Sequence, residues 1–256
     1  MDIKLSESFT YKKLLRFTLP SIVMMIFTSI YGVVDGFFVS NFVGKTPFAA
    51  VNFIMPFLMI LGAIGFMFGT GGSALVSKTM GEGDPEKAKR IFSLLIYVST
   101  ACAVVIAVVG IALLRHLASL LGAEGELLEN CVRYGRIILI ALPAYVLQFE
   151  FQSFFVTAEK PQLGLAFTVA AGVTNMVLDA LLVAVFPLGL EGAAAATAIS
   201  QAVGGIAPLV YFARPNKSLL RLTKTRFDGK ILLKTCTNGS SELMSNISMS
   251  LVGMLY

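Results

Sequence analysis

Long apolar runs dominate this sequence and leave few folds open to it. Each run is long enough to cross the hydrocarbon core of a bilayer as a helix, which takes about 20 mainly apolar residues. Hydrophobic residues make up 56% of the chain and charged residues only 14%. The sequence therefore predicts an all-α, polytopic membrane protein. The six runs lie at roughly 16–40, 47–77, 91–114, 130–156, 163–186 and 190–212.

A seventh apolar run begins near Asp228 and reaches Tyr256. Leu232-Leu233-Lys234 at its start repeats Leu14-Leu15-Arg16 at the start of the first run, although chance similarity of two basic helix starts is an alternative. Six crossings return a chain to its starting side, so two such units would be parallel repeats, as in some secondary transporters. We therefore expect half of a two-lobe protein, with the C-terminal lobe missing from this chain. Its parts are an N-terminal six-helix lobe (1–212), a cytoplasmic linker (213–229) and the truncated start of a C-terminal lobe (230–256).

The basic residues predict the orientation in the membrane. If the N-terminus is cytoplasmic, sixteen of the 20 Lys and Arg lie on the cytoplasmic side, and only Lys45, Arg115, Arg133 and Arg136 lie outside. This is the bias of the positive-inside rule. We predict a multi-pass protein of the cell membrane with a cytoplasmic N-terminus. The net charge of +5 follows from this topology, so no nucleic-acid partner is expected.

Cysteine and histidine give no pattern for a metal site. Cys102, Cys131 and Cys236 lie in or beside apolar runs, at spacings that suit neither a zinc site nor a disulfide framework. His116 is the only histidine. We expect no cofactor and no protein-bound transition metal.

Four acids fall inside the predicted helices, namely Asp35, Glu150, Asp179 and Glu242. A charge at the centre of a membrane helix costs at least about 2.5 kcal/mol unless it is neutralised, paired or hydrated. Asp35 lies about 27 Å along its run from Phe17, and Asp179 about 24 Å from Leu163, if both runs are helical. Both aspartates therefore belong to the outer half of the membrane, as functional groups or as buried structural hydrogen-bond partners.

Other polar residues fall at the same depth. Asn175 is one turn below Asp179, Thr197 lies about 10 Å from the outer end of the sixth run, and Tyr134 enters the same layer from the fourth. Burial and a neighbouring carboxylate both favour protonation of one acid, so the group suits a proton. Its hard oxygen atoms equally suit a sodium ion, by extension from calcium and magnesium sites. The coupling ion, H+ or Na+, stays open.

Prolines interrupt four of the runs, at Pro20, Pro56, Pro143 and Pro208. A proline removes one helical hydrogen bond and permits a kink. We expect the first helix to break early at Pro20 and the seventh at Asn238-Gly239. Pro20 lies 15 residues below Asp35, so a change of charge at Asp35 could alter the bend of the first helix. Static packing is the alternative role of such a proline.

Several motifs together resemble the multidrug and toxic compound extrusion (MATE) family. They are LPSI and VDGFFVSNFVG in the first run, FGTGGSALVSKTMGEGDPEKAK after the second, SFFVTAEKPQLG after the fourth, and N-x-x-x-D from Asn175 to Asp179. The resemblance implies a twelve-helix, two-lobe antiporter that exports amphipathic organic cations against H+ or Na+. It also implies a cation-coupling site of Asp35, Asn175, Asp179 and Thr197, with Pro20 as a hinge. Another branch of the family carries a glutamate in its seventh helix, which Glu242 would match.

Two features bear on the substrate. The 11 Met and 20 Phe suit repacking around varied organic cations, although such residues are also ordinary core and lipid-facing residues. Glu150 lies between Gln148 and Gln152 near the inner end of the fourth run. It would either contact cationic substrates or face the cytoplasmic headgroups, and we expect the headgroups.

Two other functions compete with drug export. An intramembrane aspartyl protease would use two membrane aspartates as an acid and base pair. Gly81-Glu82-Gly83-Asp84 spells its G-x-G-D signature, but Pro85 and the basic residues that follow predict a cytoplasmic turn. A lipid-linked sugar flippase of the same superfamily would carry arginines in a central cavity, whereas the basic residues here lie at the rims. We expect a transporter and no enzyme.

Overall fold

A computed structural model describes residues 11–216 and 218–255, and every long element in these ranges is a helix. Six of the helices are long and apolar enough to cross a membrane, which confirms the all-α membrane fold. Two of these six end in a π-helical segment, labelled η. In chain order the elements are α1 (Tyr11–Phe38), η1 (Val39–Val43), α2 (Lys45–Gly81), α3 (Pro85–Leu120), α4 (Gly125–Thr157), α5 (Pro161–Asp179), η2 (Ala180–Val185), α6 (Gly189–Ala213) and α7 (Gly229–Leu255).

α3 extends beyond its apolar run because a polar residue caps it. The third apolar run begins at about residue 91, whereas α3 begins at Pro85. Asp84 precedes it and accepts a hydrogen bond from the backbone N–H of Lys87 at 3.0 Å. Such an N-cap satisfies one of the free N–H groups of the first turn. Hydropathy alone marks the membrane-buried part of a helix and misses these capped turns.

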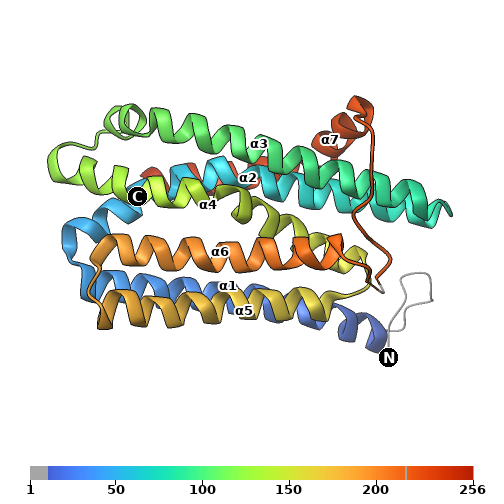
Figure 1. Cartoon of the computed structure of the whole chain (residues 1–256), viewed down its shortest axis with the longest axis horizontal. Helices are drawn as coiled ribbons and strands as arrows, with labels where there is room; N and C mark the ends of the chain where they lie inside the picture. Colours follow the sequence, from blue (N-terminus) through green and yellow to red (C-terminus); the bar gives the residue numbers. More distant parts are fainter. Residues whose placement is uncertain (1–10, 217, 256) are drawn as a thin grey trace.

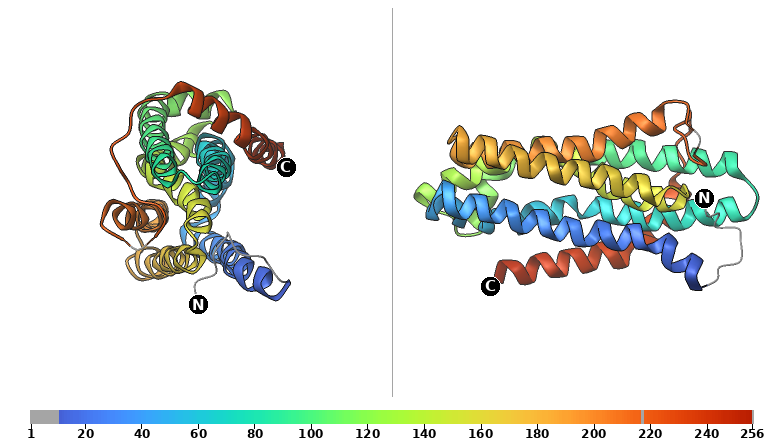
Figure 2. Two further views of the ribbon diagram at one scale, coloured as in Figure 1. Left: turned by 90° about the vertical axis from the view of Figure 1, so that its right-hand side faces the viewer. Right: turned by 90° about the horizontal axis from the view of Figure 1, so that it is seen from below.

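The six long helices lie lengthwise beside one another (Figure 1). α4 is central and packs on α2, α3 and α6, while α1 packs on α5 and α5 on α6. Figure 2 shows α1, α5 and α6 on one side of the bundle and α2, α3 and α7 on the other. The end that carries the α2–α3 turn and the 213–229 linker is termed the inner end, and the end that carries the α3–α4 loop is termed the outer end.

Glycines let α4 approach its neighbours closely. A Cβ on Gly65 of α2 would lie 2.7 Å from the carbonyl oxygen of Val146, and one on Gly205 of α6 would lie 2.9 Å from the carbonyl carbon of Ala144. Small residues at such crossings let the two backbones pack closely. In a membrane the hydrophobic effect does not drive helices together, because lipid is as apolar as the side chains, so this packing drives their association. The α2–α4–α6 layer is therefore packed backbone against backbone.

An aromatic cluster fills the inner half of this layer. The ring centroids of Phe92 and Phe154 are 4.8 Å apart, and those of Phe92 and Phe212 are 5.1 Å apart. Phe151 stacks on Phe212 at 5.4 Å, and Phe155 lies 5.0 Å from Phe212. These rings join α3, α4 and α6 into one buried core.

Two expectations about helix continuity were wrong. α1 continues through Pro20, and α7 continues through Asn238 and Gly239. In a proline-containing helix the remaining hydrogen bonds hold the turns together, so the helix kinks and need not stop. The first turns of α1 point away from the line of the rest of the helix in Figure 2.

α7 is less apolar than we expected. Within the described ranges it is not among the helices that qualify as membrane spans. Its middle carries Asn238, Ser240, Ser241 and Glu242, which lower its hydropathy. α7 packs along α2, where a Cβ on Gly71 would lie 2.6 Å from the backbone nitrogen of Gly239. Close backbone contact with α2 and the packing of Ile231, Leu232 and Cys236 against the inner core hold this helix in place.

Candidate functional site

Two π-helical segments lie at the outer ends of the helices that carry the aspartates. η1 begins at Val39, four residues after Asp35, and η2 begins directly after Asp179. The two segments contact each other. π-Helical turns are rare and are frequent at functional sites. Counted at the α-helical rise, Asp35 and Asp179 lie about 9–12 Å from the outer ends of η1 and η2.

Five polar side chains from four helices meet at this depth. The Thr197 hydroxyl of α6 donates to Asp35 Oδ1 of α1 at 3.5 Å. The side chains of Asp179 and Asn175, both on α5, also contact Asp35. Tyr134 of α4 reaches Thr197 with its hydroxyl, which lies 3.7 Å from the sulfur of Met55. The structure thus brings together all four residues of the predicted coupling site, with Tyr134 beside them.

The most deeply buried hydrogen-bond acceptors of this cluster lack donors among the described residues. Asp179 is 0% exposed and Asn175 is 1% exposed, whereas Asp35 is half-buried. Neither carboxylate oxygen of Asp179 nor Oδ1 of Asn175 has a hydrogen-bond partner among the described residues. The described ion pairs lie elsewhere, at Lys78–Glu82, Lys89–Glu86 and Arg115–Glu129.

This arrangement determines what the cluster can bind. Two carboxylates that face each other without a counter-charge repel, and buried acceptors without donors are unfavourable. A proton shared by Asp35 and Asp179 would relieve both problems, because it adds a donor and removes a charge. A monovalent cation coordinated by the carboxylate, amide and hydroxyl oxygens would do the same. The cluster therefore suits a small cation.

Three further polar residues lie next to this cluster and were not predicted as site residues from the sequence. Tyr31 lies one turn below Asp35 and contacts the Gln148 side chain, and Gln201 lies one turn below Thr197. Gln148 and Gln201 are buried, and the side-chain oxygen of each lacks a partner within the described residues. The i, i+4 spacing of Tyr31 to Asp35 and of Thr197 to Gln201 was the available signal. Polar groups therefore continue from the cluster toward the inner end.

The expectation that Glu150 faces the headgroups was wrong. Glu150 is 0% exposed, because α3 covers it. The Ser99 hydroxyl of α3 donates to Glu150 Oε2 at 2.5 Å, while Oε1 has no partner in the part of the chain described. Glu150 lies 16 residues after Tyr134, or about 24 Å along α4. It is a separate buried acid in the inner half and does not belong to the Asp35 cluster.

Glu242 and Asp84 also lie apart from the cluster. Glu242 is half-buried on α7, whose main neighbour is α2 rather than the helices that carry the cluster. Asp84, the acid of the G-x-G-D sequence, is exposed and caps α3. Gly83 before it has a φ of 87°, which glycine adopts readily in a turn. The segment is therefore a turn, as predicted, and not a protease motif within a membrane helix.

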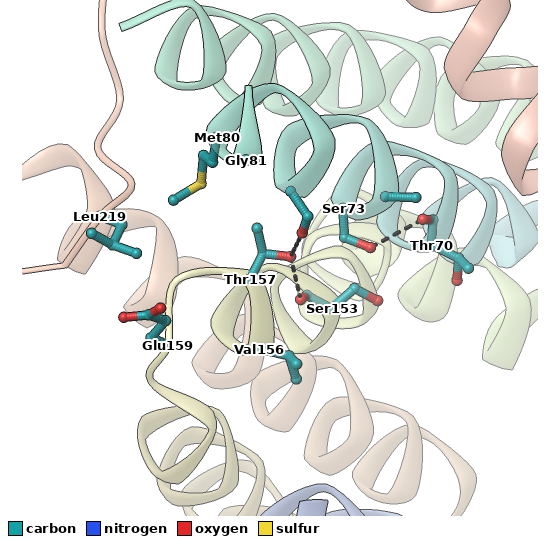
Figure 3. Close-up of a pocket in the computed structure, with 11 residues that line it drawn as sticks. Thr70, Ser73, Met80, Gly81, Ser153, Val156, Thr157, Glu159 and Leu219 are labelled. Atoms are coloured by element: carbon teal, nitrogen blue, oxygen red, sulfur yellow. Dashed lines mark hydrogen bonds between the residues drawn. The ribbon is translucent and has the colours of Figure 1, made fainter. Parts of the chain in front are cut away.

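A cavity of about 950 Å³ opens at the inner end between α2 and α4 (Figure 3). Ser77 donates to the Thr157 hydroxyl at 3.3 Å, and Ser73 donates to the carbonyl of Thr70 at 3.0 Å. Met80, Val156 and Leu219 give the cavity apolar walls, and Ser153 and Glu159 also line it. The lining combines hydroxyl groups with apolar surface.

The protein resembles known membrane transporters in sequence and in structure. The family model described as MatE matches residues 20–181. The multidrug export protein MepA of Staphylococcus haemolyticus is 30% identical over 213 residues, which cover 83% of this chain and 47% of that protein. MepA of Staphylococcus saprophyticus is 27% identical over 250 residues, which cover 97% and 55%. The chain thus spans about half the length of the curated relatives it matches.

A solved structure shows the same arrangement of helices. The crystal structure of MATE in the straight conformation superposes with a TM-score of 0.86, at 23% sequence identity, over 93% of this chain and 53% of that one. This likeness supports the fold independently of the sequence match.

Proposed function

Because this chain belongs to the MatE family, we propose that it forms one lobe of a secondary active multidrug exporter. The exporter moves amphipathic organic cations outward and is driven by H+ or Na+ that moves inward. Proteins of this family are transporters rather than enzymes, and the MepA relatives are named as multidrug export proteins. A second lobe, for which the relatives of about twice this length have room, would complete the substrate path.

The coupling cation binds at Asp35 and Asp179, with oxygen atoms from Asn175 and Thr197. The observation that carries this proposal is the pair of facing carboxylates, one of them fully buried and with neither oxygen bonded to a described residue. The pair repels itself when both groups are charged, and binding of one cation removes the repulsion. Loading and release of the cation therefore favour two different arrangements of the helices that carry the acids.

α1 is the helix that responds to this change of charge. It packs mainly on α5, and side chains such as Met25 and Val33 are exposed along its length. Pro20 leaves the carbonyl of Arg16 without its usual backbone donor. A helix with few neighbours and one missing bond can bend without disturbing the α2–α4–α6 layer. Pro20 therefore acts as the hinge through which the charge at Asp35 moves α1.

The cavity at the inner end accepts the substrate. Its volume of about 950 Å³ lies within the range of about 300–1,000 Å³ for pockets that hold drug-sized ligands. Its serine and threonine hydroxyls accept hydrogen bonds from ammonium groups, and Met80 adapts to varied apolar surfaces. These properties suit amphipathic cations without selecting one compound.

The test is efflux of a cationic dye by the full-length exporter in a pump-deficient host. We expect efflux to require either a proton gradient or a sodium gradient, applied one at a time in membrane vesicles. Retention of the dye under both gradients would remove the support for drug export. If neither gradient drives efflux and another energy source does, the proposed coupling site is refuted.

A further inference from the structure

A second pocket, of about 570 Å³, lies at the inner end between α3 and the 213–229 linker. Lys87 and Arg90 of α3 and Lys224 and Arg226 of the linker line it. All four side chains are exposed, and none forms an ion pair with a residue that the structure describes. These four residues are termed the basic pocket. They place four positive charges around one hollow.

Specific contacts fix the linker beside α3. The Ser93 hydroxyl is fully buried; it accepts a hydrogen bond from the backbone N–H of Thr223 at 2.8 Å and donates to the carbonyl of Lys89 at 2.8 Å. The backbone N–H of Leu222 donates to the carbonyl of Phe212 at 2.9 Å. Leu220 is fully buried against the inner aromatic cluster. The two cations of the linker are therefore held opposite those of α3 by the fold.

Among the described residues that line the pocket, the one acid already accepts hydrogen bonds from backbone N–H groups. Asp228 Oδ1 accepts hydrogen bonds from the backbone N–H groups of Lys230 and Ile231, at 2.9 and 3.3 Å, and so caps the start of α7. A carboxylate at a helix N-terminus is stabilised by the helix dipole. The pocket thus keeps an excess of positive charge, which suits an anion.

The apolar side chains beside the cations indicate the kind of anion. Phe227 is 77% exposed, and Ile91 and Ile231 also line the pocket. The pocket lies at the end of the bundle that the lysine and arginine distribution assigns to the cytoplasm. We propose that the basic pocket binds the phosphate headgroup of an anionic phospholipid in the cytoplasmic leaflet, with Phe227 against its glycerol or acyl region. Basic pockets at this level of a membrane protein bind such headgroups.

A bound lipid would link two parts of the chain that the coupling site does not touch. Its phosphate would join the first turns of α3 to the segment that leads into α7. The proposal is independent of the coupling ion and of the exported substrate, so it can hold even if the proposed transport function fails.

Native mass spectrometry of the full chain, released from detergent that contains equal amounts of phosphatidylglycerol and phosphatidylcholine, tests the proposal. The pocket variant replaces Lys87, Arg90, Lys224 and Arg226 with Gln. The control replaces Arg16, Arg214, Arg221 and Lys234 with Gln, which removes the same charge from the same end outside the pocket. We expect the pocket variant to retain at least about tenfold less phosphatidylglycerol than the wild type, and the control to retain nearly all of it.

Two measurements keep the outcomes distinct. Circular dichroism must show equal helix content in both variants, and the single variant Arg90→Gln provides a milder test if the fourfold change unfolds the chain. Equal loss of lipid from pocket variant and control would show a diffuse surface charge and overturn the proposal. Retention of no more phosphatidylglycerol than phosphatidylcholine by the wild type would also overturn it, because the pocket would then not select an anionic headgroup.

Discussion

Asp35 of α1 and Asp179 of α5 face each other in the outer half of the bundle, and neither takes part in an ion pair that the structure describes. The Thr197 hydroxyl donates to Asp35, whereas the oxygens of Asp179 accept no hydrogen bond in the described ranges. The two acids therefore differ in their hydrogen bonding. Asp179 depends on Asp35, or on a cation between them, for its partner.

Asp35→Asn should abolish coupled export and leave the protein folded. The amide keeps the shape of the side chain and its contact with Thr197 but carries no charge that a cation can neutralise. Dye efflux from cells that express the full-length exporter measures the loss. Asp84→Asn is the matched control, because asparagine also caps helices and Asp84 lies outside the site. Full transport by Asp35→Asn under either gradient would defeat the coupling proposal.

Thr197→Val should weaken the apparent affinity for the coupling cation about fivefold, which is the effect of about 1 kcal/mol for one hydrogen bond. Valine has the shape of threonine but has no hydroxyl to donate to Asp35. The measurement is the concentration of coupling ion that gives half-maximal efflux. Thr197→Ser keeps the hydroxyl and should behave like the wild type. An unchanged ion dependence in Thr197→Val would exclude Thr197 from the site.

Pro20→Ala should slow export while it stabilises the chain. Alanine restores a backbone N–H opposite the carbonyl of Arg16, which straightens and stiffens α1. Efflux rate and thermal unfolding followed by circular dichroism provide the two readouts. Pro143→Ala serves as the comparison, because α4 is held by α2, α3 and α6 and does not need to bend. A normal efflux rate with Pro20→Ala would exclude the hinge.

Glu150→Gln should leave stability in detergent equal to or above that of the wild type at neutral pH. Glutamine still accepts the hydrogen bond from Ser99 and avoids a buried charge. Glu150→Ala should lower the free energy of unfolding by about 2–4 kcal/mol, because it leaves a cavity. Thermal unfolding of the two variants gives the comparison. A large loss of stability in Glu150→Gln would mean that the charged form is required.

Gly65→Ala and Gly205→Ala should each lower the free energy of unfolding by about 1–3 kcal/mol, the usual effect of overpacking. The added methyl groups would meet the backbone of α4 at Val146 and at Ala144. Gly32→Ala is the control, since nothing lies within 4 Å of its Cβ position. Chemical unfolding in detergent measures all three. A control that loses as much stability as the test variants would contradict the close contact.

Hydropathy and helical rise predicted the fold and the depth of the polar residues. Six long helices cross one slab of fixed thickness, so counting residues from the start of each run places Asp35, Asp179 and Thr197 in one layer. The same counting does not tell which neighbour covers a side chain. Glu150 was therefore expected at the headgroups, whereas α3 covers it and Ser99 binds it.

Other features depend on contacts that a single sequence does not reveal. The π-helical segments share no sequence pattern, because η1 reads VSNFV and η2 reads ALLVAV. Gln148 becomes notable only because Tyr31 reaches it from another helix. The polar residues in the middle of α7 were visible in the sequence, but the apolar residues on either side led to the prediction of an apolar run. Its partner α2 is set by the glycines that let the two backbones meet.

The contact between Gly71 and Gly239 joins α2 to the helix that follows the linker, about 15 Å from the start of α7. Two helices that pack backbone to backbone around such glycines can rotate about the contact more easily than they can separate there. If α7 opens a second lobe, the two lobes share a fulcrum in their inner half. A larger side chain at either glycine would move this fulcrum and change how far the opposite end of the protein can open.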